Sequence, residues 1–133
     1  MKTVLVTILA TLVLAYPQTS MSAWNPDSFA DETTLELLTV GSEEGEHWFK
    51  VWLVVLNGEV YVRLGSRSVE RINANTSSPY LGVRIAGEVF PKVRADPAPE
   101  MVERVATAMA DKYFSDLWIR HFSHPLTMRL RAE

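Results

Sequence analysis

The residues with the clearest chemical potential are three arginines and a serine near the middle of the chain: Arg63, Ser66, Arg67 and Arg71. A guanidinium presents a planar fork of donors to anionic oxygens, and a serine hydroxyl with nearby turn amides adds further donors. The group therefore predicts a phosphate-binding site. The same spacing also fits a solvated basic turn that pairs with neighbouring glutamates, so both interpretations stay open.

A β-hairpin is predicted to position this group, because two apolar segments flank the dipeptide Asn57-Gly58. Both central residues of a type I′ turn need a positive φ, which Asn and Gly tolerate best. Residues 48–56 are apolar on both faces, which is typical of a central strand covered on both sides. Residues 59–64 alternate instead, and Arg63 falls on their polar face. The phosphate-binding group is therefore expected to leave a buried sheet on its polar side.

Aromatic residues of the same hairpin offer a second kind of contact. Trp48, Trp52 and Tyr61 could stack on a flat ring, although aromatics in a central strand more often belong to the core. Neither the arginines nor these aromatics indicate a particular reaction.

Composition indicates one globular domain with a substantial apolar core. The chain has 133 residues, of which 47% are hydrophobic, and its formal net charge is −3. A general nucleic-acid-binding protein would be basic, so this class is not expected. The sequence contains no cysteine, which excludes thiol catalysis and cysteine-ligated metal. Without disulfides, the domain must be stable through its core alone.

The N-terminal segment has the organisation of a secretory signal peptide. Lys2 is followed by an uncharged apolar run from Val4 to Tyr16, and then by Pro17 and small polar residues. This run is shorter than the roughly 20 apolar residues that a membrane span needs. We therefore expect residues 1–23 to be removed and residues 24–133 to form an exported domain, periplasmic or secreted. An N-terminal membrane anchor or a buried N-terminal helix is the alternative.

Further elements complete a mainly β pattern. Beyond the hairpin, strands are predicted over residues 33–40, 80–86, 88–95 and 126–131. Residues 66–75 are predicted to form a short helix or an irregular connection, and residues 116–122 a short helical segment. Pro91 predicts an edge position or a β-bulge in its strand, since proline has no N–H to donate to a ladder. Mostly antiparallel strands with one helix laid across them predict a small closed or half-open barrel.

The main helix is predicted to begin at Asp96-Pro97, because Asp96 can cap it and Pro97 suits its first turn. Five apolar residues fall on one face at helical spacing, namely Val102, Val105, Ala106, Met109 and Tyr113. This stripe predicts packing against the sheet.

Two histidines give a weaker alternative. His121 and His124 are three residues apart in a predicted helical segment and could share a metal. Pro125 follows directly, and no third ligand is obvious nearby in the sequence, so we predict no metal site. A haem-type or other small-ligand protein that uses one of these histidines stays as the weakest alternative.

Several short segments, taken in their order and spacing, resemble a bacterial domain family of unknown function. That family is related to the pyridoxamine 5′-phosphate oxidase-like split β-barrels, whose members bind FMN or a deazaflavin. The resemblance extends over roughly residues 25–131. The matching segments are Val51–Val55, Gly58–Arg63, Val83–Gly87, Asp111–Tyr113 and Thr127–Leu130.

The resemblance implies a split β-barrel of about six strands, often a homodimer, with the flavin at the dimer interface. In flavin-binding relatives the strand before the hairpin runs along the isoalloxazine ring, and the end of the next strand with the following turn holds the phosphate. Carried over to this sequence, the implied contacts are Lys50, Val51 and Trp52 for the ring, and Arg63, Ser66 and Arg67 for the phosphate. Arg71 joins the predicted phosphate contacts because it belongs to the same group of arginines.

The implied activity is that of a small flavin-dependent oxidoreductase with an unknown substrate. The long basic motif that clamps FMN in pyridoxamine phosphate oxidases is absent, and so is the substrate-binding tail of that enzyme. Oxidation of pyridoxamine phosphate is therefore not predicted. The alternative function is that of a secreted binding or structural module that has the same barrel without a cofactor.

Overall fold

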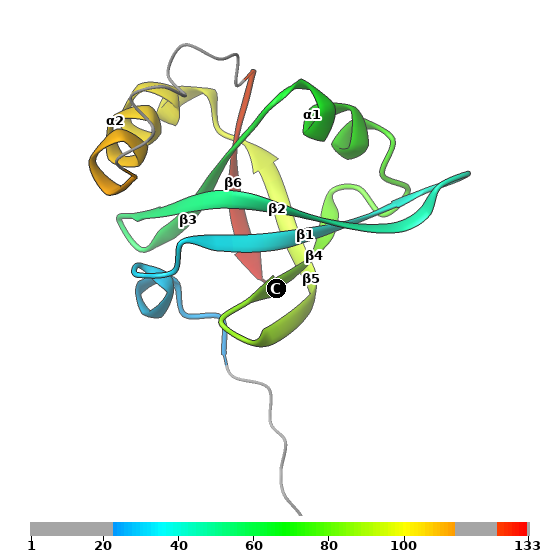
Figure 1. Cartoon of the computed structure of the whole chain (residues 1–133), viewed down its shortest axis with the longest axis horizontal. Helices are drawn as coiled ribbons and strands as arrows, with labels where there is room; N and C mark the ends of the chain where they lie inside the picture. The colour runs from blue at the N-terminus through cyan, green and yellow to red at the C-terminus, as the bar shows by residue number, and fades with distance from the viewer. Residues whose placement is uncertain (1–22, 114–124, 133) are drawn as a thin grey trace, which may run out of the picture.

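Six antiparallel strands close into a barrel within residues 23–113 and 125–132, the parts of the chain that the computed structural model describes (Figure 1). Their order around the barrel is β1-β2-β3-β6-β5-β4, and β4 pairs back to β1. The predicted mainly β, mostly antiparallel barrel is therefore confirmed. The strands are β1 (Thr34–Gly41), β2 (Gly45–Leu56), β3 (Glu59–Leu64), β4 (Tyr80–Ile85), β5 (Glu88–Pro97) and β6 (Leu126–Ala132).

Short helices accompany the barrel in the same residue ranges. They are the 3-10 turns η2 (Pro26–Phe29) and η3 (Pro99–Met101) and the α-helices α1 (Ser66–Asn73) and α2 (Val102–Lys112). In Figure 1 both α-helices lie on one side of the barrel, and η2 lies with the β4–β5 hairpin on the opposite side. No helix among the described residues is long and apolar enough to cross a membrane. The helix predicted over residues 116–122 and residues 1–22 of the predicted signal peptide lie outside the described residues.

The β2–β3 hairpin turns as predicted. Asn57 has φ 52° and Gly58 has φ 75°, so both central residues take the left-handed conformation of a type I′ turn. The β4–β5 hairpin uses the same device, with φ 53° at Ala86 and φ 79° at Gly87. Both tight turns join antiparallel neighbours, so each hairpin contributes a pair of adjacent strands to the barrel.

Pro91 lies at an irregularity in β5. Val83 pairs with Phe90 and Leu81 pairs with Val93, so β5 advances by three residues (93 − 90) where β4 advances by two (83 − 81). The extra residue makes a β-bulge, and a bulged residue is not paired in the ladder. Proline is tolerated there because its missing N–H is not needed for a ladder hydrogen bond. The bulge alternative predicted from Pro91 is confirmed, because a closed barrel has no edge strand.

Alternate residues of the strands fill the barrel. In β3, Val60, Val62 and Leu64 point inward and are fully buried. In β2 the two faces are both covered, as predicted: Leu53 belongs to the barrel core, whereas Val54 packs beneath α2 on the outside. The barrel is therefore solid inside, and any site must lie on its outer surface or at its ends.

The main helix begins later than predicted. Asp96 and Pro97 belong to β5, where Asp96 pairs with Arg129 of β6, and the first helical turn starts at Pro99. The carboxylate of Asp96 accepts hydrogen bonds from Arg94 at 3.0 and 3.2 Å. The predicted Asp96 cap is therefore wrong, because pairing with a strand distant in sequence keeps this backbone extended.

The packing face of α2 agrees with the prediction except at its start. Val102 is 42% exposed, so its predicted burial is wrong. Met101, in the preceding 3-10 turn, is buried instead. The predicted residues that are buried against β2 and β3 are Val105, Met109 and Tyr113.

The two ends of the barrel are closed in different ways. At the η2 end, Trp24, Phe29 and Phe90 meet edge to face with ring centroids 5.1 to 6.0 Å apart. At the α1 end, Val69 and Ile72 pack against the barrel core, but no residue of α1 is buried. The α1 end is therefore the more open of the two.

Candidate functional site

The first turn of α1 carries two of the predicted phosphate contacts, Ser66 and Arg67. The N-cap is Gly65, which is extended (φ −79°, ψ 176°) and has no side chain to cap the helix. The amide of Val69 donates to the Gly65 carbonyl at 3.0 Å, and the earlier amides of the helix have no carbonyl within it to bond. The first turn contains no acidic residue. This end of α1 therefore has the donors and the partial positive charge that favour an anion.

The Arg67 guanidinium adds a formal charge to this end of the helix. Within the described residues it forms no ion pair and no hydrogen bond. Its exposed side chain reaches a cavity of about 490 Å³ between α1 and the β1–β2 turn. Arg67 is therefore available to an external anion.

Arg71, one helical turn further on, lines the same cavity but faces acidic neighbours. Its Nε lies 3.5 Å from Oε1 of Glu44, and its guanidinium carbon lies 5.9 Å from the ring centroid of Phe49. The Nε–H is buried and donates no hydrogen bond to any of the described residues. The carboxylates of Glu43 and Glu70 also line the cavity. Arg71 therefore already has a counter-ion, unlike Arg67.

Arg63 lies on the outer face of β3, opposite Thr127 of β6. It does not line the cavity that Arg67 and Arg71 share, and neither does Ser66. The structure therefore brings together only two of the four predicted phosphate residues at this cavity. Ser66 and Arg67 share the start of α1, while Arg63 stands at the end of the strand that leads into it.

The predicted ring contacts on β2 point in different directions. The side chain of Val51 faces the barrel core and is 9% exposed, so only its backbone could touch a ligand outside. Lys50 is exposed and pairs with Glu36 in the β1–β2 register. Trp52 is half-buried on the outer face and stacks on Tyr113, with ring centroids 4.7 Å apart and an interplanar angle of 7°. Lys50 and Trp52 are therefore the side chains that a ring on this face would meet.

The end of α2 holds this part of β2 through contacts that the sequence pattern did not single out. The Tyr113 hydroxyl lies 2.7 Å from the Leu53 carbonyl oxygen and 2.8 Å from that of Thr33, and it accepts from the Leu53 amide at 3.3 Å. Lys112 Nζ donates to the carbonyls of Glu32 at 2.6 Å and Leu53 at 3.1 Å. These hydrogen bonds satisfy the backbone amide and carbonyl of Leu53, just beyond the last residue of β2 that pairs with β1.

Burial shifts the pKa values of both Lys112 and Tyr113. It lowers the pKa of Lys112 and raises the pKa of Tyr113, because each charged form loses hydration. The apolar stripe of the helix predicted packing for Tyr113. Its hydrogen bonds and its stack on Trp52 join residues about sixty positions apart, which no local pattern indicates.

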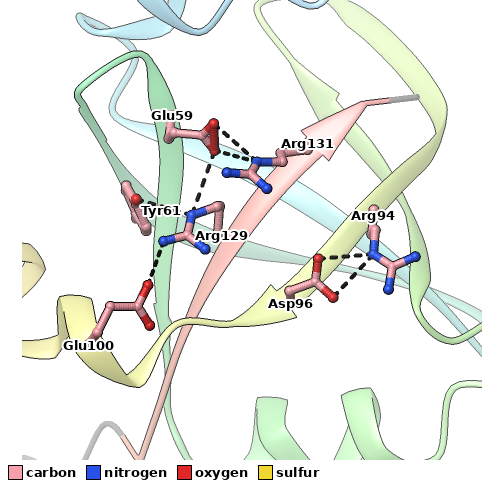
Figure 2. Close-up of polar contacts among 7 residues, drawn as sticks. All are labelled: Glu59, Tyr61, Arg94, Asp96, Glu100, Arg129 and Arg131. Carbon is pink, nitrogen blue, oxygen red and sulfur yellow. Dashed lines mark hydrogen bonds and ion pairs between the residues drawn. The ribbon is translucent and has the colours of Figure 1, made fainter.

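A second group of arginines, on the outer face of β5 and β6, is paired with nearby acidic residues (Figure 2). Arg129 donates to Glu100 at 2.7 Å and lies over the Tyr61 ring at 5.3 Å, and Arg131 pairs with Glu59 at 2.8 Å. The hydrogen bond to Glu100 is the main cause of the raised pKa of Arg129. These charges already have partners, so this group is a structural network and a poor candidate for a ligand site.

Metal ligands do not gather in the described part of the chain, where no group of three histidine, aspartate or glutamate side chains could hold an ion. His47 stacks on Phe49 with ring centroids 6.2 Å apart. His121 and His124 lie outside the described residues, so the haem-type alternative stays a hypothesis.

Comparison with solved structures finds the same barrel in other proteins. HutZ, the haem storage protein of Vibrio cholerae, matches with a TM-score of 0.62 at 16% identity, over 80% of this chain and 87% of HutZ. The F420-H2-dependent reductase FDR-A matches with a TM-score of 0.59 at 14% identity, over 75% of this chain and 95% of the reductase. An FAD-binding protein of Mesorhizobium loti matches with a TM-score of 0.53 at 12% identity, over 78% and 82%.

These structural neighbours are split β-barrel proteins, and the chain shares their fold. The fold that the resemblance to the pyridoxamine 5′-phosphate oxidase-like barrels implied is therefore confirmed. No protein-family model matches the sequence, and no curated protein matches it significantly.

Proposed function

We propose that this split β-barrel binds a flavin-type cofactor, FMN or a deazaflavin, with its phosphate at the start of α1. One observation carries the proposal: the first turn of α1 combines amides without helical acceptors with an Arg67 guanidinium that has no counter-ion among the described residues. The fold adds support, because two similar structures are an F420-H2-dependent reductase and an FAD-binding protein.

The phosphate contacts divide into direct and distant ones. Ser66 and Arg67 would touch the phosphate, because a helix start offers amides, a hydroxyl and a guanidinium to the same anion. Arg63 precedes them on β3 and would contribute from the strand side. Arg71 would act only at longer range, since Glu44 lies 3.5 Å from its Nε.

The ring would lie along the outer face of β2. Lys50 is exposed there, and Tyr113 holds Trp52 in a fixed orientation by stacking on one of its faces. Val51 would contribute its backbone. A bound flavin supplies the electron or hydride chemistry, while the protein supplies binding and orientation. The chain would then be a small oxidoreductase whose substrate class is open.

Two further features belong to the proposal. We expect a homodimer whose second copy covers the ring, and an exported mature domain that begins near residue 24. A mass of one chain at micromolar concentration would contradict the dimer. Recovery of the full-length chain, with residues 1–23 intact, would contradict export through a cleaved signal peptide.

A visible absorption spectrum tests the cofactor. The purified protein is mixed with FMN, and separately with a deazaflavin, and excess cofactor is removed. A retained flavin band is expected, and Arg67→Ala should weaken binding by about tenfold or more, since a hydrogen bond to a charged group is worth about 1.5–3 kcal/mol. Arg104→Ala, on the exposed face of α2, is the matched control and should bind normally. A spectrum without cofactor in every mixture would favour the cofactor-free module.

Haem is the second candidate ligand, favoured by the likeness to the haem storage protein HutZ. A Soret band after addition of hemin, lost in His121→Ala or His124→Ala, would support it. Retention of FMN with no Soret band would exclude it in favour of the flavin.

A further inference from the structure

A second cavity, of about 410 Å³, lies between α1 and the rim of the barrel formed by β4, β5 and β6. Val69 and Ile72 of α1 form one wall, and Leu81, Ala95 and Met128 of the barrel core form the floor. The α1 residues at this cavity differ from those at the Arg67 cavity. It is therefore a separate site from the proposed cofactor site.

The apolar face of α1 is incompletely covered at this cavity. No residue of α1 is buried, and Val69 and Ile72 remain only partly buried against the core. On α2, by contrast, Val105 and Met109 are almost fully buried. Burial of apolar surface is the main favourable term in folding, so α1 leaves part of its available stabilisation unused. A molecule seated beneath α1 would complete that burial.

Two of the polar side chains at the cavity, those of Asn75 and Asp96, are already engaged. The side chain of Asn75 donates to the Tyr80 carbonyl at 2.9 Å and accepts from the Val40 amide at 3.0 Å. Asp96 is the ionisable residue in the lining among the described residues, and Arg94 holds its carboxylate through two hydrogen bonds. The cavity thus presents no uncompensated charge, which favours an uncharged ligand.

We propose that this cavity binds an uncharged aromatic small molecule the size of two or three rings. An apolar cavity of about 150 Å³ is large enough for benzene, so a volume of about 410 Å³ accommodates a naphthyl ring with a phenyl substituent. Asn73 and Ser78 at the rim leave room for a single polar substituent on the ligand. The site rests on the cavity and its lining, independently of flavin binding.

Titration of the full chain with N-phenyl-1-naphthylamine, an uncharged fluorescent probe, tests the proposal. We expect a saturable rise in fluorescence with one probe per chain. Ile72→Glu places a charge in the wall and should weaken binding by about tenfold or more. Val89→Glu is the matched control, because Val89 is a 45% exposed aliphatic residue outside the cavity lining. Its binding should equal that of the wild type.

Methyl NMR spectra locate the probe. Shifts are expected at Val69, Ile72 and Leu81, and none at Val102 on α2. No saturable binding, equal loss in both glutamate variants, or shifts confined to other residues would overturn the proposal. If near-ultraviolet circular dichroism reveals that Ile72→Glu is unfolded, Val69→Thr replaces it and should weaken binding several-fold. Displacement of the probe by FMN would also overturn it, because the two sites would then be one.

Discussion

The two ends of the barrel contain different kinds of packing. At the η2 end, the rings of Phe29 and Phe90 are 5% and 6% exposed and meet Trp24 edge to face, so this end is plugged by rigid apolar side chains. At the α1 end, an amphipathic helix without a single buried residue covers the rim and borders two cavities. The contrast indicates that one end secures the fold, while the other offers surface for ligands.

The two α-helices repeat this contrast on one side of the molecule (Figure 1). Buried apolar residues and the Tyr113 hydrogen bonds attach α2 to the barrel. α1 has neither kind of attachment, and its N-terminal turn has no side-chain cap. The uncapped N-terminal turn of α1 and its partly buried apolar face are the parts that we propose for ligands. The same parts contribute little to the stability of the fold.

Removal of a ring from the aromatic plug should have the largest effect on stability. We expect Phe90→Ala to lower the free energy of unfolding by about 3–5 kcal/mol, because it leaves a cavity among rings that cannot collapse into it. Urea denaturation followed by tryptophan fluorescence measures the change. A loss below about 1 kcal/mol would remove the distinction between the two ends.

The second effect concerns the attachment of α2. Tyr113→Phe keeps the ring on Trp52 but removes the hydroxyl from the Leu53 and Thr33 carbonyls. We expect a loss of about 1–3 kcal/mol, since the Thr33 carbonyl and the Leu53 amide lose this partner, whereas the Leu53 carbonyl keeps its bond from Lys112. Thermal denaturation gives the value, and Tyr113→Leu, which also removes the stack, should lose more. Equal stability of the Phe variant and the wild type would mean that packing alone holds α2.

A matched truncation at the α1 end should cost less than one at the plug. Ile72→Ala removes apolar atoms that are only partly buried, so we expect a loss of no more than about 1.5 kcal/mol. The same urea experiment compares it with Phe90→Ala. A loss as large as that of Phe90→Ala would show that α1 is as essential to the fold as the plug.

The smallest effect is expected in the surface network of Figure 2. The hydrogen bond from Arg129 lowers the pKa of Glu100 below its usual 4.5 in the folded protein. The ion pair therefore contributes stability above that value and loses it as the pH falls through the lowered pKa. Glu100→Gln should reduce the drop in melting temperature between pH 7 and pH 3 only slightly, because the carboxylate is exposed. Glu103→Gln, another exposed glutamate, is the control.

The sequence predicted the local parts of the candidate site and missed its long-range parts. The tight turn at Asn57-Gly58 and the short helix that begins near Ser66 follow from residue types and their periodicity. The expectation that the three arginines act as one group is less well supported, because only Arg67 and Arg71 share a cavity. Which of them meets a ligand depends on the β1–β2 turn, which lies more than twenty residues away in the sequence.

The sequence by itself determined the alternation in β3 and the apolar second face of β2, because each depends on the chemistry of neighbouring residues. At Pro91 the sequence left an edge position or a bulge open, and closure of the barrel decided for the bulge. Only the tertiary structure decided the start of α2, the stack of Trp52 on Tyr113 and the cavity under α1. These features arise where segments that are distant in the chain pair or pack, and strand pairing overrides local helix signals such as Asp96-Pro97. The local pattern of residue types therefore specifies the strands, while closure of the barrel determines which of its outer faces remain open to a ligand.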